Sequence, residues 1–165
     1  MHIGEGFEGG GVNAAHINLI LGTREALCGA FVASAANPGP GHIPFQAVLQ
    51  PNLPAKPATL FVAKAVLTGP AHETMTWGPA QAGVAAGVTE ALLTGVLPDE
   101  AEDGWLAIAL VWVDPAADDA EAVYANNRAA ALNACRRALT AGWPDRDALA
   151  AGVAAPSNPF FTPKA

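Results

Sequence analysis

The chain has 165 residues, a length that favours a single domain over residues 1–165 with a hydrophobic core of its own. Hydrophobic residues make up 52% and charged residues 14%, which is apolar for a soluble monomer and predicts that subunits bury part of the surface. The net charge of -7 excludes partners that need a basic surface, so neither nucleic acid nor an anionic membrane is expected.

The cysteines and the apolar runs bear on the compartment. Cys28 and Cys135 fall in segments with helical patterns and lack the spacing of metal or redox motifs, so both are expected to be small buried hydrophobic residues. The longest apolar run, 105–113, is far shorter than a membrane span, and the N-terminus carries no basic segment followed by an apolar one. A reducing compartment, the cytoplasm, is therefore the expected location.

The first elements of the chain are two strands. Residues 3–11 are acidic and rich in glycine, which predicts a short edge strand followed by a turn. Residues 14–21 alternate with a period of two, so one face is apolar while His16 and Asn18 share the other face. These two side chains lie about 7 Å apart along a strand, and both can therefore touch one small ligand. Taken alone, His16 fits either a structural residue or an acid–base catalyst.

A helix and a proline-rich region come next. Thr23 is the expected N-cap of a helix that ends near Ala36, just before a run of prolines and glycines. Residues 43–50 have strand character. Residues 51–57 contain three prolines and predict a stiff turn.

A second alternating strand is expected over residues 59–68, with Lys64 and Val66 on one face. Lys64 is the one charged residue of this strand, and it either extends past the sheet edge or meets a ligand. The next helix is expected to begin at residues 77–81, with Pro79 at its first position and Gln81 in the first turn.

The remaining elements complete a fold class. Residues 98–103 are acidic and expected at the surface, and residues 105–113 are apolar on both faces, as in a central strand. A long helix is expected over 117–141 and a short one over 145–152, before an extended tail at 155–165. This order of elements predicts an α+β two-layer sandwich with its helices mainly on one face of the sheet.

Several common types of active site are absent from the sequence. It has no G-x-S-x-G elbow, no paired histidines on a helix and no cysteine set for zinc, so neither a metal nor a permanently bound cofactor is expected. His16, Lys64 and Gln81 instead bring polar groups from two strands and a helix start to an apolar background. Convergent polar groups of this kind are typical of a small-molecule site.

Three blocks of sequence resemble the formaldehyde-activating enzymes of one-carbon metabolism. They are Ala-Ala-His-Ile-Asn-Leu-Ile-Leu-Gly at 14–22, the proline-rich block at 47–60 and Gly-Pro-Ala-Gln at 78–81, and the likeness continues through 117–120 to 158–160. The resemblance implies a ribosomal protein S5 domain 2-like fold and a homopentamer. It also implies a lyase of formaldehyde detoxification or methylotrophy, which condenses formaldehyde with tetrahydromethanopterin to give the methylene adduct and water.

The resemblance also implies roles for individual residues. His16 matches the family's proton donor, while Lys64 and Gln81 match positions that bind substrate. In this role His16 is the general acid of the condensation, and the reduced pterin is a co-substrate.

Other substrate positions depart from the family pattern. Asn18 stands where the family has aspartate, Gln46 where it has leucine and Val66 where it has threonine. The usual His-Pro-Phe near the C-terminus reads Asn-Pro-Phe at 158–160. The altered pocket leaves two other interpretations open. One is a non-catalytic module that senses or buffers formaldehyde or a pterin adduct, and the other is an oligomeric protein with an inert pocket.

Overall fold

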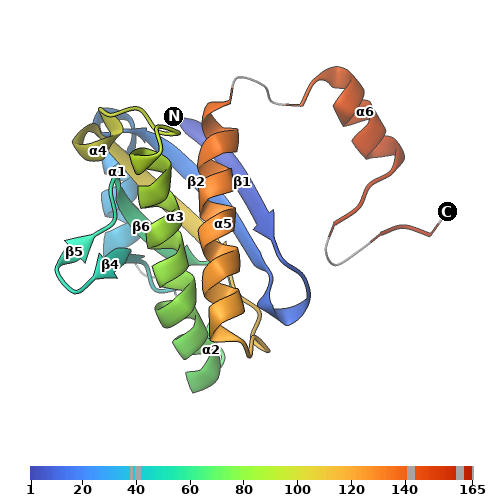
Figure 1. Cartoon of the computed structure of the whole chain (residues 1–165), viewed down its shortest axis with the longest axis horizontal. Helices are drawn as coiled ribbons and strands as arrows, with labels where there is room; N and C mark the ends of the chain where they lie inside the picture. Colours follow the sequence, from blue (N-terminus) through green and yellow to red (C-terminus); the bar gives the residue numbers. More distant parts are fainter. Residues whose placement is uncertain (38, 40–41, 141–143, 159–161, 165) are drawn as a thin grey trace.

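The computed structural model describes residues 1–37, 39, 42–140, 144–158 and 162–164. A five-stranded mixed sheet forms its central layer, and β6 runs parallel to β7 whereas the other neighbours are antiparallel (Figure 1). In spatial order the strands are β1 (His2–Glu8), β2 (Ala15–Thr23), β7 (Trp105–Trp112), β6 (Ala58–Ala63) and β3 (Phe45–Gln46). The apolar segment at 105–113 is therefore the central strand, as predicted.

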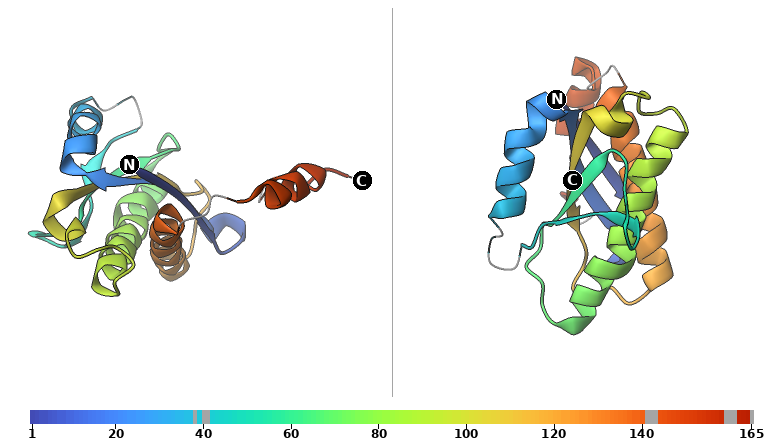
Figure 2. Two further views of the ribbon diagram at one scale, coloured as in Figure 1. Left: turned by 90° about the horizontal axis from the view of Figure 1, so that it is seen from above. Right: turned by 90° about the vertical axis from the view of Figure 1, so that its left-hand side faces the viewer.

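Two long helices cover one face of this sheet. α3 (Gln81–Leu93) and α5 (Ala120–Leu139) lie side by side on that face, while α1 (Arg24–Ala36) packs on the opposite face against β2 and β7 (Figure 2). The alternation in β2 explains the arrangement, because its apolar set faces the two long helices and is buried: Ala15, Ile17, Leu19 and Leu21. The mixed α/β class with helices mainly on one face is confirmed.

α5 lies close to the edge strand β1 because two glycines face it. A Cβ atom added at Gly4 would lie 2.0 Å from the Ala134 carbonyl oxygen, and one added at Gly6 would lie 2.0 Å from the Ala130 carbonyl oxygen. No side chain fits in that space, so the glycines of this strand allow the helix backbone to approach the sheet.

The region between α1 and β6 departs from the expected single strand over 43–50. Ala47 interrupts it, and its backbone N–H donates to the Thr59 carbonyl, which separates β3 from β4 (Val48–Gln50). β4 pairs with β5 (Leu53–Pro54) as a small separate sheet, with Asn52 at a φ of 66° in the turn. The segment expected to be only a stiff turn, 51–57, thus contains the second strand of a hairpin, since Leu53 and Pro54 pair with β4.

Two further expectations about the middle of the chain were wrong. The strand expected over 59–68 ends at Ala63, so Lys64 follows the strand and Val66 lies outside it. The helix expected to begin at 77–81 begins at Pro70 as α2 (Pro70–Met75) and continues through a π-helical turn at Thr76–Ala80 into α3. Pro79 lies inside this π turn, whose wider hydrogen-bond spacing tolerates the missing N–H.

The acidic segment at 98–103 is only partly at the surface. It leads into a short turn of helix, α4 (Ala101–Gly104), in which Ala101 is buried. The long helix α5 has Asp119 as its N-cap, with the side chain accepting from the Ala122 N–H, and residue 141 of the predicted range lies outside the described residues.

The C-terminal helix is confirmed as α6 (Arg146–Ala154), which extends away from the sheet with no buried residue (Figure 1). A 3-10 turn, η1 (Gly11–Asn13), joins β1 to β2. Cys135 is buried as expected, but Cys28 is exposed, because it lies on the side of α1 turned away from the sheet. In the part of the chain that the structure describes, no helix is both long and apolar enough to cross a membrane.

Candidate functional site

The face of the sheet opposite α3 and α5 carries the histidine singled out by the sequence. His16 and Asn18 lie on this face of β2, and in the edge strand β1 Phe7 pairs with His16 while Glu5 pairs with Asn18. Ala63 pairs with Val111 and His16 with Trp112, so Lys64, one residue past the end of β6, falls level with His16 across the central strand.

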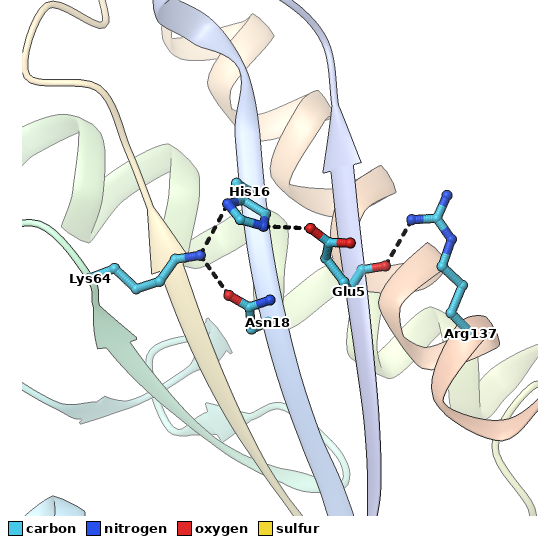
Figure 3. A network of polar contacts seen from close by, with 5 residues as sticks. All are labelled: Glu5, His16, Asn18, Lys64 and Arg137. Carbon is cyan, nitrogen blue, oxygen red and sulfur yellow. Dashed lines mark hydrogen bonds and ion pairs between the residues drawn. The ribbon is translucent and has the colours of Figure 1, made fainter. Parts of the chain in front are cut away.

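Four side chains form a hydrogen-bonded chain across this face (Figure 3). Lys64 Nζ lies 2.9 Å from Asn18 Oδ1 and 3.3 Å from His16 Nδ1. On the other side of the imidazole, His16 Nε2 lies 2.8 Å from Glu5 Oε1. Arg137 of α5 donates from Nη1 to the backbone carbonyl of Glu5 at 2.9 Å. Three of the predicted site residues, His16, Asn18 and Lys64, thus lie in contact with one another.

The surroundings of Lys64 favour its neutral form more than water does. Burial lowers the pKa of the Lys64 amine from its ordinary value of 10.5, and the negative charge of Glu5 partly opposes that shift. The direct neighbours of the amine are a neutral amide and an imidazole nitrogen, and no carboxylate of the described residues forms a hydrogen bond or ion pair with it.

A hollow of about 430 Å³ opens next to the cross-strand neighbours of His16, although His16 itself is not part of its wall. Phe7 and Trp112, the two cross-strand neighbours of His16, form part of its wall, and the Phe7 ring centroid lies 6.2 Å from that of His16. The rest of the lining comes from the β1–β2 turn and the end of β7: Gly9, Gly10, Gly11, Val12, Ala14 and Asp114. This volume is within the range of small-molecule sites.

Gln46 and Gln81 lie together in a second hollow, of about 390 Å³, at the β3 edge of the sheet. Gln81 is 8% exposed, and its Oε1 accepts from the Val48 N–H at 2.5 Å. The remaining lining residues are Ile43, Phe45, Val48 and Trp77.

The two groups of predicted site residues are separate within one chain. Gln46 pairs with Leu60, which is level with Ile20 of β2 across β7. Gln46 is therefore three strands from β2, roughly 14 Å across the strands, and four residues from the level of His16, roughly 13 Å along them. Val66 is 53% exposed and lines neither of these two hollows. The expected convergence of His16, Lys64 and Gln81 on one spot does not occur within the chain.

Glu5 is the neighbour of His16 that the sequence analysis did not identify. The edge strand places its glycines on the helix side and Ile3, Glu5 and Phe7 on the other side. The alternation of the sequence is therefore enough to predict that Glu5 lies on the open face of the sheet. The alternation does not predict the register between β1 and β2, and it is this register that places the Glu5 carboxylate next to His16. Among the described residues, no group of three or more His, Cys, Asp or Glu side chains is arranged to hold a metal ion.

Comparison with known proteins identifies relatives over almost the whole chain. Residues 3–161 match the family described as formaldehyde-activating enzyme (Fae). A 5,6,7,8-tetrahydromethanopterin hydro-lyase of Methanosarcina barkeri is 38% identical over 159 residues, which is 96% of this chain and 89% of that protein.

Bifunctional enzymes are similar over one part of their length. The bifunctional enzymes Fae/Hps of Archaeoglobus fulgidus and Methanococcoides burtonii are each 38% identical, over 146 and 148 residues respectively. The alignments cover 88% and 89% of this chain but 37% of each of those proteins, so this chain corresponds to little more than a third of their length.

Proposed function

Because the chain belongs to the formaldehyde-activating enzyme family, we propose that it condenses formaldehyde with tetrahydromethanopterin to give methylene-tetrahydromethanopterin and water. The observation that supports this most directly is His16, an acid–base group on the open face of the sheet whose cross-strand neighbours Phe7 and Trp112 line a ligand-sized hollow. Its ring is held between Glu5 and Lys64, so both of its nitrogens have defined neighbours.

The proposed chemistry needs one general acid. A pterin nitrogen attacks formaldehyde and gives a carbinolamine, whose hydroxyl must leave as water before the second nitrogen closes the ring. His16 protonates that hydroxyl, and general acid catalysis of this kind is worth about 10²- to 10⁴-fold. Much of the remaining acceleration is positioning, because both pterin nitrogens must face one carbon.

The neighbours of His16 have distinct tasks in this proposal. Glu5 accepts the Nε2 proton, which fixes the ring and leaves Nδ1 on the side of Lys64. Lys64 and Asn18 lie at that side and orient the reduced pterin. No permanently bound cofactor has a part in this chemistry, since the pterin and formaldehyde are both substrates.

An oligomer would bring the two groups of site residues together. Gln46 and Gln81 lie at one edge of the sheet, far from His16, and apolar side chains on several elements are exposed in the single chain: Ile3, Val66, Trp77, Leu149 and Val153. We propose a homopentamer of single-domain subunits with the S5 domain 2-like fold, acting in the cytoplasm. In it Gln46, Gln81 and Val66 of one subunit contact the pterin held beside His16 of the next.

The second candidate function is a binding module that senses formaldehyde or a pterin adduct without turnover. It is favoured by Asn18, whose neutral amide contacts Lys64 where the family resemblance places a carboxylate. A missing charged hydrogen bond costs on the order of 1.5–3 kcal/mol, enough to weaken pterin binding by one to two decades.

The test is the rate of methylene-adduct formation from formaldehyde and tetrahydromethanopterin, measured above the spontaneous rate. We expect acceleration by the wild type, a loss of about 10²- to 10⁴-fold in His16→Ala, and full activity in His2→Ala. His2→Ala is the matched control because it removes an exposed imidazole at the opposite end of the same strand pair. A wild type without acceleration, or a His16→Ala variant as fast as His2→Ala, would leave the binding module as the better function.

A further inference from the structure

The Lys64 amine has a contact pattern that suits a neutral amine. The Nε2 atom of His16 faces the Glu5 carboxylate, which is a pure acceptor, so a neutral imidazole carries its proton there and presents a bare Nδ1 to Lys64. The amine therefore contacts two acceptors, His16 Nδ1 and Asn18 Oδ1. A neutral amine has two N–H groups for these two acceptors and one remaining lone pair, whereas an ammonium has a third N–H and no lone pair.

The charges around this amine agree with its contacts. The carboxylate of Glu5, whose negative charge acts on Lys64, is on the far side of the imidazole, and burial acts against the ammonium by lowering the pKa of Lys64. Lys56, by contrast, forms an ion pair with Asp103 at the surface, so a carboxylate directly contacts its amine. A desolvated lysine without a bound carboxylate is the usual form of a lysine that reacts with carbonyl carbon.

We propose that Lys64 is a catalytic nucleophile that captures formaldehyde covalently as an iminium before the carbon reaches the pterin. This deepens the proposed function, because it rests on formaldehyde being the substrate at this site. Lys64 lies level with His16 across β7, which puts the general acid within reach of the hydroxyl that must leave.

The capture step balances with the groups present. When Lys64 is protonated and His16 is neutral, Lys64 reaches its neutral form by giving a proton to His16 Nδ1, and the free amine then adds to formaldehyde. A proton moves from nitrogen to oxygen, giving a neutral carbinolamine. The imidazolium then returns its proton to the hydroxyl, the C–O bond breaks, and water leaves. The net change converts one ammonium and one formaldehyde into one protonated iminium and one water.

Transfer to the acceptor releases the lysine. A pterin nitrogen attacks the iminium carbon, its proton moves to the lysine nitrogen, and the C–N bond to Lys64 breaks with the electron pair remaining on Lys64. The resulting pterin iminium closes on its second nitrogen with loss of a proton. Lys64 thus acts as a relay that holds the carbon in the site until the pterin is in place.

The capture can be tested without any pterin. The full-length protein is exposed briefly to limiting formaldehyde, reduced with borohydride to convert any iminium into a stable N-methyl group, and mapped by peptide mass spectrometry. The lysines of the chain are Lys56, Lys64 and Lys164, so fragment-ion sequencing of the peptides assigns each label to one lysine. We expect Lys64 to be labelled at least about tenfold faster than the other two. Labelling of Lys64 at the rate of Lys56 or slower would overturn the proposal.

Substitution by arginine separates capture from binding. Lys64→Arg keeps the positive charge and hydrogen-bond donors but has no nucleophilic amine. In the pterin assay we expect it to lower kcat by about 10²-fold, while Lys56→Arg, the matched control, leaves kcat unchanged. A Lys64→Arg enzyme with unchanged kcat and a raised KM would show that Lys64 only binds substrate, and the proposed condensation would still stand. Rapid labelling of Lys64 in a wild type without pterin turnover would support the capture and overturn the condensation.

Discussion

The two faces of the central sheet are built from alternate residues of the same strands. One face packs against the long helices, and the other carries the polar network around His16. In β1 the helix side is made of glycines that allow α5 to approach, while Glu5 on the other side reaches His16. In β2 Ile17 is fully buried toward the helices, while its neighbours His16 and Asn18 join the polar network. Substitutions at adjacent positions should therefore affect either stability or chemistry, and rarely both.

The largest effect is expected on the helix side, at Gly6. In Gly6→Ala the new Cβ meets the Ala130 carbonyl at 2.0 Å, so α5 or β1 must move. We expect the free energy of unfolding in urea to fall by about 3 kcal/mol. Gly10→Ala is the matched control, because Gly10 is extended and nothing lies within 4 Å of its added Cβ. Equal losses in the two variants would mean that the tight approach of α5 is not what holds the edge strand.

On the open face, Asn18→Asp should strengthen pterin binding but slow the reaction of Lys64 with formaldehyde. A carboxylate at this position adds a charged partner for the pterin, so its Kd should fall by about 10- to 100-fold in a binding titration. The same charge lies beside Lys64 and stabilises its ammonium, so the formaldehyde-dependent labelling of Lys64 should slow by about tenfold.

The control for this change is Asn37→Asp, which adds an equal charge at the exposed end of α1. Adding Val66→Thr to Asn18→Asp tests the other departure from the family, since Thr restores a hydroxyl at an exposed position after Lys64. No gain in pterin affinity with either variant would mean that these departures did not reshape the pocket.

Glu5→Gln should have a smaller effect on turnover than the loss of His16, because Glu5 contacts the histidine and not the substrate. The amide keeps the size of the carboxylate but holds the Nε2 proton of His16 less strongly, so kcat should fall about tenfold while stability stays within about 1 kcal/mol. Glu8→Gln is the matched control, because Glu8 lies on the same strand and contacts Asn133 of α5 instead. If both variants keep wild-type kcat, Glu5 does not position the histidine.

The sequence predicted these faces better than it predicted where elements end. A period of two was enough to place His16 and Asn18 on one face and Ile17 on the other. The end of β6 at Ala63 was missed because alternation continues into the following residues, although Lys64 still faces the site. The start of α2 was missed because Pro79 looks like a first helical residue, whereas a π turn accommodates it inside the helix. The separation of Gln81 from His16 depends on strand order, which local patterns do not determine.

The smallest functional effect is expected at the two cysteines. Their thiol reactivity compares the helix on the open face of the sheet, α1, with the packed helix α5. Cys135 lies on α5 against the sheet, and burial raises the pKa of its thiol to about 12. Cys28 lies on α1 and is exposed. Near pH 8 the thiolate is the form that attacks a thiol reagent, so Cys28 should react promptly while Cys135 reacts only as fast as the chain opens. Cys28→Ser should abolish the fast phase without changing turnover, and Gly6→Ala should speed the slow phase, because a loosened α5 exposes Cys135 more often. A slow phase unaffected by Gly6→Ala would mean that α5 and β1 do not open together.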